Sequence, residues 1–338
     1  MKIYLDKNFV RNYFTIQEDN KGVFSHFRKV VLQQYESYEL VTNYASLEEI
    51  GTQKEDLLFF EMLFEGIPNI EFTPFNVDYD FVWRASNEGG FILFLTEQTT
   101  EEEEKWSKLR GYEFISHNTI IHKWAKYSNY ESLEWSLLNP NSLDPELCFK
   151  DYSQLSFLKK FPLNSIVIVD NFILGSKRKI KENLLSILDS LLINTIGKKI
   201  SIIIVSKDRN ILSGEIPSVQ DKLKEAHAYI ETSVQSKFPG LQIDLGIIKY
   251  NKSFGIDIHD RRIYTNYMVI SATAGFEVYR NNKRVYNDSD IKSESVFKRF
   301  RRKTSIVQLA NIVAFFKKAQ NYPDYYYPNN ISSPLLKL

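Results

Sequence analysis

The chain has 338 residues, of which 43% are hydrophobic and 25% charged, a balance typical of a globular protein and not of a disordered one. Its apolar runs are strand length, far short of the roughly 20 residues that cross a bilayer, and its first residues include charges where a signal peptide would be apolar. A single cysteine excludes an internal disulfide and a zinc site built on several thiolates. We therefore expect a cytoplasmic protein of two or three domains with no membrane contact.

The charge is divided unequally along the chain. Residues 1–150 carry 14 Lys and Arg against 25 Asp and Glu, whereas residues 151–338 carry 29 against 17. Such a division predicts two domains with different partners, of which the basic one favours phosphates. Two alternatives stay open: the halves attract each other, or the surface charge simply drifts between domains.

Strand and helix patterns alternate through residues 1–125, the expected acidic domain. The expected strands cover residues 2–6, 38–44, 69–75, 91–97 and 112–116, with helices around 23–35, from 46 onward and at 99–111. Ser46 and either Thr99 or Thr100 are predicted helix N-caps, and Gly111 is the predicted end of the last helix. This alternation predicts a mostly parallel sheet of the α/β class.

A second α/β domain is expected at residues 161–320, after a connecting segment at 126–160 and before a tail at 321–338. Its expected strands cover residues 165–172, 200–206, 241–250 and 261–273, and its expected helices cover 177–199, 218–240 and 304–322. Residues 276–286 are a further expected strand segment, which forms a hairpin with the strand at 261–273 if Asn281 and Asn282 make a tight turn.

Two basic segments in this second domain are candidate nucleic-acid contacts. One is a run of five cations around an aromatic ring, made of Lys298, Arg299, Phe300, Arg301, Arg302 and Lys303. The other opens a predicted helix and consists of Lys177, Arg178 and Lys179. Cations neutralise phosphates, an aromatic ring stacks on a base, and a helix N-terminus adds to phosphate attraction. The alternative is a solvated basic face or a surface for docking a protein.

A histidine, a cation and an amide follow one another at His259, Arg261 and Asn266. This spacing resembles the His-x-Lys-x4-Asp motif of the phospholipase D superfamily, which implies a nucleophilic imidazole, a phosphate clamp and an acid that holds the ring. Arg261 can replace lysine as the clamp, but Asn266 cannot supply a negative charge. Three alternatives stay open: a phosphate- or nucleic-acid-binding remnant, metal-independent hydrolysis by a homodimer, and a structural role.

The resemblance extends over residues 164–285. The order of strands and helices there is similar to that of the phospholipase D-like domain at the C-terminus of MIT proteins and of related domains in bacterial conflict systems. The family's Asp-Pro-Tyr is represented by Asp170, Asn171 and Phe172, and its glycine turns by the segment ATAGF at 272–276. The resemblance implies a mixed sheet with helices.

The start of the chain, Asp6-x-Asn8 after a strand, resembles that of PIN-domain nucleases over residues 1–120. The resemblance implies a three-layer sandwich whose carboxylates hold Mg²⁺ or Mn²⁺ for phosphodiester cleavage. The implied metal ligands are Asp6, Glu49 (or Glu48) and Glu97, with Asp78 and Asp80 as spare candidates. Alternatively, Asp6 caps a helix and the glutamates are first-turn acids. His117 and His122 are five residues apart, off the spacing of a helical metal pair, and are expected to be ordinary residues.

Three hypotheses about function follow. In the first, the basic domain holds RNA or DNA and the acidic domain cuts it with metal, within a bacterial anti-phage or other conflict system. In the second, both sites are degenerate and the protein is a binding or scaffold subunit for nucleic acid or a partner protein of a defence complex. In the third, a His259 homodimer hydrolyses phosphodiesters without metal. RNA, DNA, a nucleotide and a lipid headgroup are all open as the phosphate compound.

Overall fold

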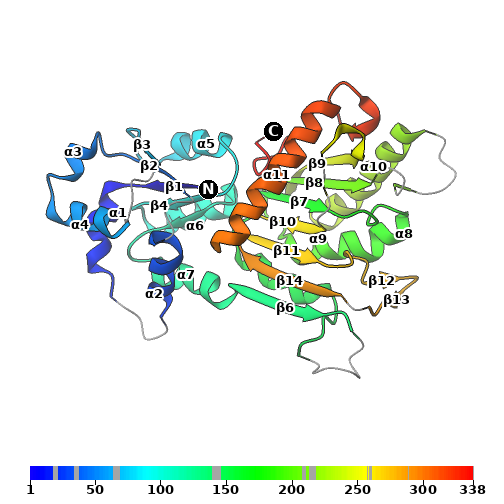
Figure 1. Ribbon diagram of the computed structural model, residues 1–338, viewed down its shortest axis with the longest axis horizontal. Helices are drawn as coiled ribbons and strands as arrows, with labels where there is room; N and C mark the ends of the chain where they lie inside the picture. The colour runs from blue at the N-terminus through cyan, green and yellow to red at the C-terminus, as the bar shows by residue number, and fades with distance from the viewer. Residues whose placement is uncertain are drawn as a thin grey trace.

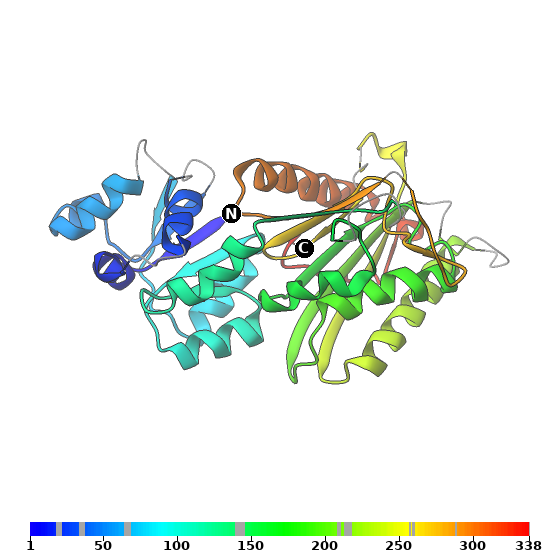
Figure 2. The ribbon, with the colours of Figure 1, turned by 90° about the horizontal axis from the view of Figure 1, so that it is seen from below.

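The computed structural model contains two β-sheets flanked by helices, and the two sheets lie side by side (Figures 1 and 2). It describes residues 1–17, 22–33, 38–63, 69–138, 146–207, 211–212, 218–256, 258, 261–287 and 289–337. The prediction of an α/β protein with two such units is confirmed. None of the helices in the described ranges is long and apolar enough to cross a membrane.

The first sheet is fully parallel, with the strand order β3-β2-β1-β4-β5. Its strands are β1 (Lys2–Leu5), β2 (Glu39–Thr42), β3 (Asn69–Phe72), β4 (Ile92–Leu95) and β5 (Glu113–Ile115). Successive side chains of a strand alternate between faces, so Ile3 and Leu5 join one buried core while Tyr4 joins another. Because β1 lies between β2 and β4, the strand order reverses there, which is where ligands of open α/β sheets commonly bind.

Helices cover both faces of this sheet, which makes it a three-layer unit. One face carries α1 (Lys7–Asn12), α2 (Val23–Phe27), α4 (Lys54–Leu63) and α7 (Ile120–Asn129), and the other carries α5 (Tyr79–Asn87) and α6 (Thr100–Arg110). The short α3 (Leu47–Ile50) follows β2. The predicted caps are present: Ser46 accepts a hydrogen bond from Glu49 N, Thr99 forms a capping box with Glu102, and Gly111 ends α6 at a φ of 71°.

The second sheet is mixed, with the strand order β15-β9-β8-β7-β10-β11-β14-β6. Its central strands β7 (Ser165–Val169), β8 (Lys198–Lys207) and β9 (Leu241–Tyr250) are parallel, and the strands β10 (Arg262–Tyr264), β11 (Met268–Ala272) and β14 (Asp290–Ser295) are antiparallel. One face packs against α8 (Lys177–Lys179), a π-helical turn (Ile180–Leu184), α9 (Leu185–Leu191) and α10 (Val219–Lys237). The other face packs against α11 (Arg299–Ala319) (Figure 2).

Two predicted elements differ from the structure. The helix expected at 177–199 ends at Leu191, because Leu192 is extended and β8 already begins at Lys198. The strand expected at 261–273 is a hairpin of β10 and β11, because a turn closes between Thr265 and Met268, with Thr265 N donating to Met268 O. The predicted turn at Asn281 and Asn282 is present, with both residues at positive φ, but it joins β12 (Tyr279–Arg280) to β13 (Lys283–Arg284) in a small hairpin of their own and not to the strand at 261–273.

The expected connecting segment and tail both contribute to the second sheet. Strand β6 (Ser132–Ser136) pairs with β14, and β15 (Tyr326–Tyr327) pairs with β9. The 3₁₀ helix Tyr152–Lys160 packs against α9. Residues 139–145, the expected linker sequence, lie outside the described residues.

The two units meet at a closely packed junction. The Tyr267 hydroxyl donates to Ile92 O and accepts from Glu113 N, both at 2.6 Å, so the second unit bridges two strands of the first. A Cβ on Gly111 would lie 2.5 Å from the carbonyl carbon of Leu163. Only glycine fits at this crossing.

Candidate functional sites

The carboxyl edge of the first sheet brings together Asp6, which follows β1, and Glu97, which follows β4. Asp6 is buried, and its carboxylate accepts hydrogen bonds from Phe9 N at 2.7 Å and Glu97 N at 2.8 Å. Burial raises the pKa of Asp6, although these two bonds act against the shift. Asp6 therefore caps α1 and ties β1 to the end of β4.

Glu97 in turn holds His117, which follows β5. Its carboxylate accepts from His117 N at 2.9 Å and lies 2.7 Å from His117 Nδ1. A glutamate beside Nδ1 fixes the orientation of the imidazole ring. No local pattern in the sequence indicated this pair, because the two residues are twenty positions apart; the adjacency of β4 and β5 places them together.

The third predicted metal ligand, Glu49, has other partners. It lies 3.1 Å from Lys7 Nζ and accepts from Ala45 N at 2.6 Å. The spare candidate Asp78 caps α5 through Phe81 N. Across the described ranges, no group of three or more His, Cys, Asp or Glu side chains is placed to hold a metal ion. Within the described ranges, Asp6, Glu49 and Glu97 are thus not gathered around one cation.

Asp170 at the end of β7 joins two motifs of the phospholipase D-like resemblance. Its buried carboxylate accepts from Phe172 N, Ile173 N and Phe276 N at 2.7–3.0 Å. Gly275, at a φ of 104°, packs so closely that a Cβ would lie 2.9 Å from Asp170 Oδ2 and 3.3 Å from Arg261 Cδ. The structure therefore brings the Asp170 turn, the ATAGF turn and Arg261 to one place.

The three residues of the predicted histidine motif do not form one visible cluster. Arg261 donates to Thr273 O at 2.9 Å, at the end of β7, and its guanidinium lies over the Phe172 ring. Asn266 is buried at the opposite end of β7, where its side chain accepts from Asn164 N and Ser165 N. His259 lies outside the described residues. The Asn266 amide also donates to Asn164 Oδ1, and Asn164 in turn donates to Arg110 O of the first unit.

The basic run before and within α11 is largely engaged by the fold. Arg302 is fully buried, donates to the carbonyls of Val296 and Phe297, and its guanidinium lies 4.2 Å from the centre of the Tyr38 ring. Arg301 and Lys298 both pair with Glu294. Phe300 is 79% exposed, and Lys303 is exposed as well. The run is therefore not a continuous cationic surface.

The second basic segment also has partners. Each of its cations lies within ion-pair distance of a glutamate, as the pairs Lys177–Glu225, Arg178–Glu182 and Lys179–Glu277 show. These pairs reduce the charge that the segment offers to a phosphate, and the exposed pairs are individually weak.

A cavity of about 660 Å³ at the junction of the two units collects lysines that the sequence keeps far apart. The first unit supplies residues of α6 and α7, and the second supplies the end of the 3₁₀ helix and the start of β8. The lysines that line it are Lys108, Lys123, Lys126, Lys159, Lys160 and Lys198. We call this the lysine cavity.

Three of these lysines have partners within the protein. Lys123 lies 2.5 Å from the buried carboxylate of Glu103, and Lys126 pairs with the buried Glu113. Lys160 donates to the Tyr130 hydroxyl. These contacts fix one wall of the lysine cavity.

The other three lysines are Lys108, Lys159 and Lys198. Within the described part of the chain, no residue accepts a hydrogen bond from their ammonium groups or forms an ion pair with them. Lys198 is only 9% exposed, and burial lowers its pKa to about 8, with the charge of Lys108 adding to the effect. The Ser107 hydroxyl, which also lines the cavity, is buried without a hydrogen-bond partner among the described residues. As far as the described residues go, the lysine cavity thus holds positive charge and a polar group that the fold does not use.

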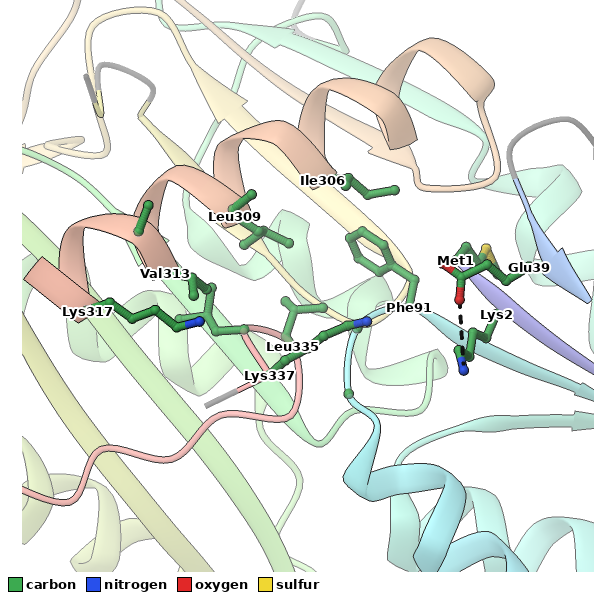
Figure 3. Close-up of a pocket in the computed structure, with 15 residues that line it drawn as sticks. Met1, Lys2, Glu39, Phe91, Ile306, Leu309, Val313, Lys317, Leu335 and Lys337 are labelled. Carbon is green, nitrogen blue, oxygen red and sulfur yellow. Dashed lines mark ion pairs between the residues drawn. The ribbon is translucent and has the colours of Figure 1, made fainter. Parts of the chain in front are cut away.

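A second cavity, of about 510 Å³, lies between α11, the start of β1 and the last residues of the chain (Figure 3). Its walls are mainly apolar, with Ile306, Leu309 and Val313 of α11 near Phe91 and Leu335. Lys2, Lys317 and Lys337 also line it.

Sequence reasoning missed the lysine cavity for a physical reason. Its lysines come from four separate segments, each of which has an ordinary composition. The cavity also lies near the amino ends of β5 and β8, whereas motif analysis of α/β proteins looks to the carboxyl ends of strands. The unequal charge division did not indicate it either, because Lys108, Lys123 and Lys126 belong to the acidic half of the chain.

No protein-family model matches the chain, and no curated protein matches it. Among solved structures, the crystal structure of phosphatidylserine synthase from Haemophilus influenzae matches with a TM-score of 0.30 and 11% identity, over 59% of this chain and 46% of that chain. The chain thus spans about half the length of that protein. A likeness at this level assigns neither a family nor a function.

Proposed function

We propose that the protein binds a phosphate-bearing ligand in the lysine cavity, and that this ligand is a nucleotide or the phosphorylated end of a nucleic-acid strand. The observation that carries the proposal is the placement of Lys108, Lys159 and Lys198, from both units, around one cavity without partners among the described residues. Gathered ammonium groups repel one another, and a polyanion between them relieves that repulsion.

The chemistry of the lining favours a phosphate attached to an organic group. Each lysine ammonium offers three donors as a compact charge, which suits the several oxygens of a phosphate. The apolar side chains of Phe161, Leu163 and Ile200 form another part of the wall, where a base or similar ring can pack. A volume of about 660 Å³ falls within the usual range for small-ligand sites, roughly 300–1,000 Å³.

A nucleic-acid ligand agrees with the basic second half of the chain. Metal-dependent cleavage, a role in bacterial defence, a protein partner and a homodimer remain predictions from resemblance. Cleavage has its own test, which compares the wild type with Asp6→Asn on RNA and DNA with Mg²⁺ or Mn²⁺. Its outcome leaves binding in the lysine cavity unaffected.

The binding proposal is tested by fluorescence anisotropy with short RNA and DNA strands, with and without a 5′-phosphate, and by competition with mononucleotides. Lys198→Met is expected to weaken binding of the phosphorylated strand by at least about tenfold, since a hydrogen bond to a charged group contributes roughly 1.5–3 kcal/mol. Affinity is also expected to fall with salt.

Lys199→Met is the matched control. Lys199 is the next residue of β8, is exposed and lies 2.6 Å from Asp244, so its loss is expected to leave binding unchanged. Equal binding of strands with and without the phosphate, or equal effects of the two variants, would contradict the proposal.

A further inference from the structure

Lys198 and Lys199 are neighbours on β8 with opposite surroundings. Successive side chains of a strand point to opposite sides, and here Lys198 lines the lysine cavity while the Lys199 side chain is 63% exposed and paired with Asp244. A lysine that is nine-tenths buried without a partner among the described residues is costly, because an ammonium ion loses its hydration there. A role in binding or catalysis explains such a lysine more readily than a contribution to the stability of the fold.

Two features of the cavity favour the neutral amine of Lys198. Burial lowers its pKa to about 8, and the charge of Lys108 acts in the same direction. A larger share of Lys198 than of an ordinary lysine is therefore neutral near physiological pH. The neutral amine is the nucleophilic form, and burial beside another cation is a known way to generate it.

We infer that Lys198 is a reactive amine that forms an imine with an aldehyde or ketone carrying a phosphate group. The inference rests on the phosphate-binding part of the proposed function, because Lys108 and Lys159 have to bind the phosphate while Lys198 reaches the carbonyl carbon. The lysine cavity is then a site of covalent chemistry and not of binding alone.

The step balances without an added oxidant or reductant. The lone pair of Lys198 Nζ attacks the carbonyl carbon, the carbon–oxygen π bond breaks, and the oxygen takes up a proton to give a carbinolamine. A second proton then reaches that oxygen, which leaves as water while the nitrogen loses its protons and the carbon–nitrogen double bond forms. Glu104 and His122 also line the cavity and can carry these protons.

The test uses the full-length protein and pyridoxal 5′-phosphate as a probe aldehyde that carries a phosphate. After incubation near neutral pH, borohydride reduces any imine, and peptide mass spectrometry locates the adduct. We expect a single adduct at Lys198, with labelling at least about tenfold above that of Lys199, a preference equal to 1.4 kcal/mol. Pyridoxal without its phosphate is expected to label weakly, and inorganic pyrophosphate is expected to suppress labelling.

Lys198→Arg tests the imine directly. Arginine keeps the positive charge but forms no imine under these conditions, so this variant is expected to lose the adduct. Lys199→Arg, the matched control, is expected to keep it. Strand binding by the wild type, measured separately, distinguishes this inference from the proposed function. Thermal unfolding of each variant verifies that it is folded.

Labelling spread over the exposed lysines, or retained in Lys198→Arg, would overturn the inference. If Lys198→Met abolishes strand binding but Lys198 is not selectively labelled in the wild type, the imine inference fails and the binding proposal stands. If Lys198 is selectively labelled and no nucleotide or strand binds, the nucleotide ligand is wrong and the imine inference stands.

Discussion

The basic run of α11 and the lysine cavity differ in how much of their positive charge is available to a ligand. The run places five cations in six consecutive residues, yet Arg302 is buried, and Arg301 and Lys298 pair with Glu294. The lysine cavity draws on residues up to ninety positions apart, yet Lys108, Lys159 and Lys198 have no partners among the described residues. The number of charged residues in a stretch of sequence is therefore a poor measure of the charge that is available to a ligand. The ion pairs and hydrogen bonds within the fold determine how much of that charge is available.

The largest effect is expected at Arg302. Arg302→Ala removes a buried guanidinium, leaves the carbonyls of Val296 and Phe297 without this donor, and opens a space against Tyr38. We expect the free energy of unfolding to fall by about 3–5 kcal/mol. Urea unfolding measures the change. Lys303→Ala, at the exposed next position, is the control and is expected to change it by less than about 0.5 kcal/mol. If Arg302→Ala and Lys303→Ala changed the free energy of unfolding equally, Arg302 would not be a buried structural residue.

A substitution of Lys198 is expected to change the free energy of unfolding by a smaller amount and in the opposite direction. Because its pKa in the folded protein is about 8, below the ordinary 10.5, the folded state bears the full cost of its charge below pH 8 and none above pH 10.5. Lys198→Met is therefore expected to stabilise the protein by about 2–3 kcal/mol near pH 7. This gain should shrink as the pH rises from about 8 to 10.5, which paired thermal melts of the two proteins can follow. A loss of stability at neutral pH would show that the ammonium has a stabilising partner.

The smallest effect is expected when a cation of the α11 run is removed and nucleic-acid binding is measured. Lys303 is exposed but does not line the lysine cavity, so Lys303→Ala is expected to change the affinity for a phosphorylated strand by less than about twofold. Anisotropy titrations at two salt concentrations measure it beside Lys159→Ala, which is expected to weaken binding more strongly. If Lys303→Ala weakened binding more than Lys159→Ala, the strand would bind at α11 and not in the lysine cavity.

The architecture could be predicted from the sequence where local patterns decide it. The alternation of apolar strands and capped helices predicted the parallel first sheet, and Ser46, Thr99 and Gly111 marked helix ends correctly. Strands β6 and β15 could not be predicted, since β6 is only half-buried and β15 has two residues. Both form because they pair with the edges of strands that are distant in sequence, β6 with β14 and β15 with β9.

The candidate sites were predictable only in part. The sequence pointed to Asp6 and Glu97 at neighbouring strand ends, and the structure places them in contact, but as a helix cap and a partner of His117. Asp170 also accepts a hydrogen bond from Phe276 N of the ATAGF turn, a contact that the sequence alone did not predict. The lysine cavity depends on how two units pack, and no single-segment pattern encodes that packing.

The pairing of β6 with β14 bears on how the second unit can be produced alone. A fragment beginning at residue 161 lacks β6, so the backbone N–H and C=O groups of β14 that face β6 would lose their partners. Unsatisfied strand edges recruit other chains, which leads to aggregation. A fragment that starts before Ser132 keeps its own edge strand and is the better choice for crystallisation or spectroscopy of that half.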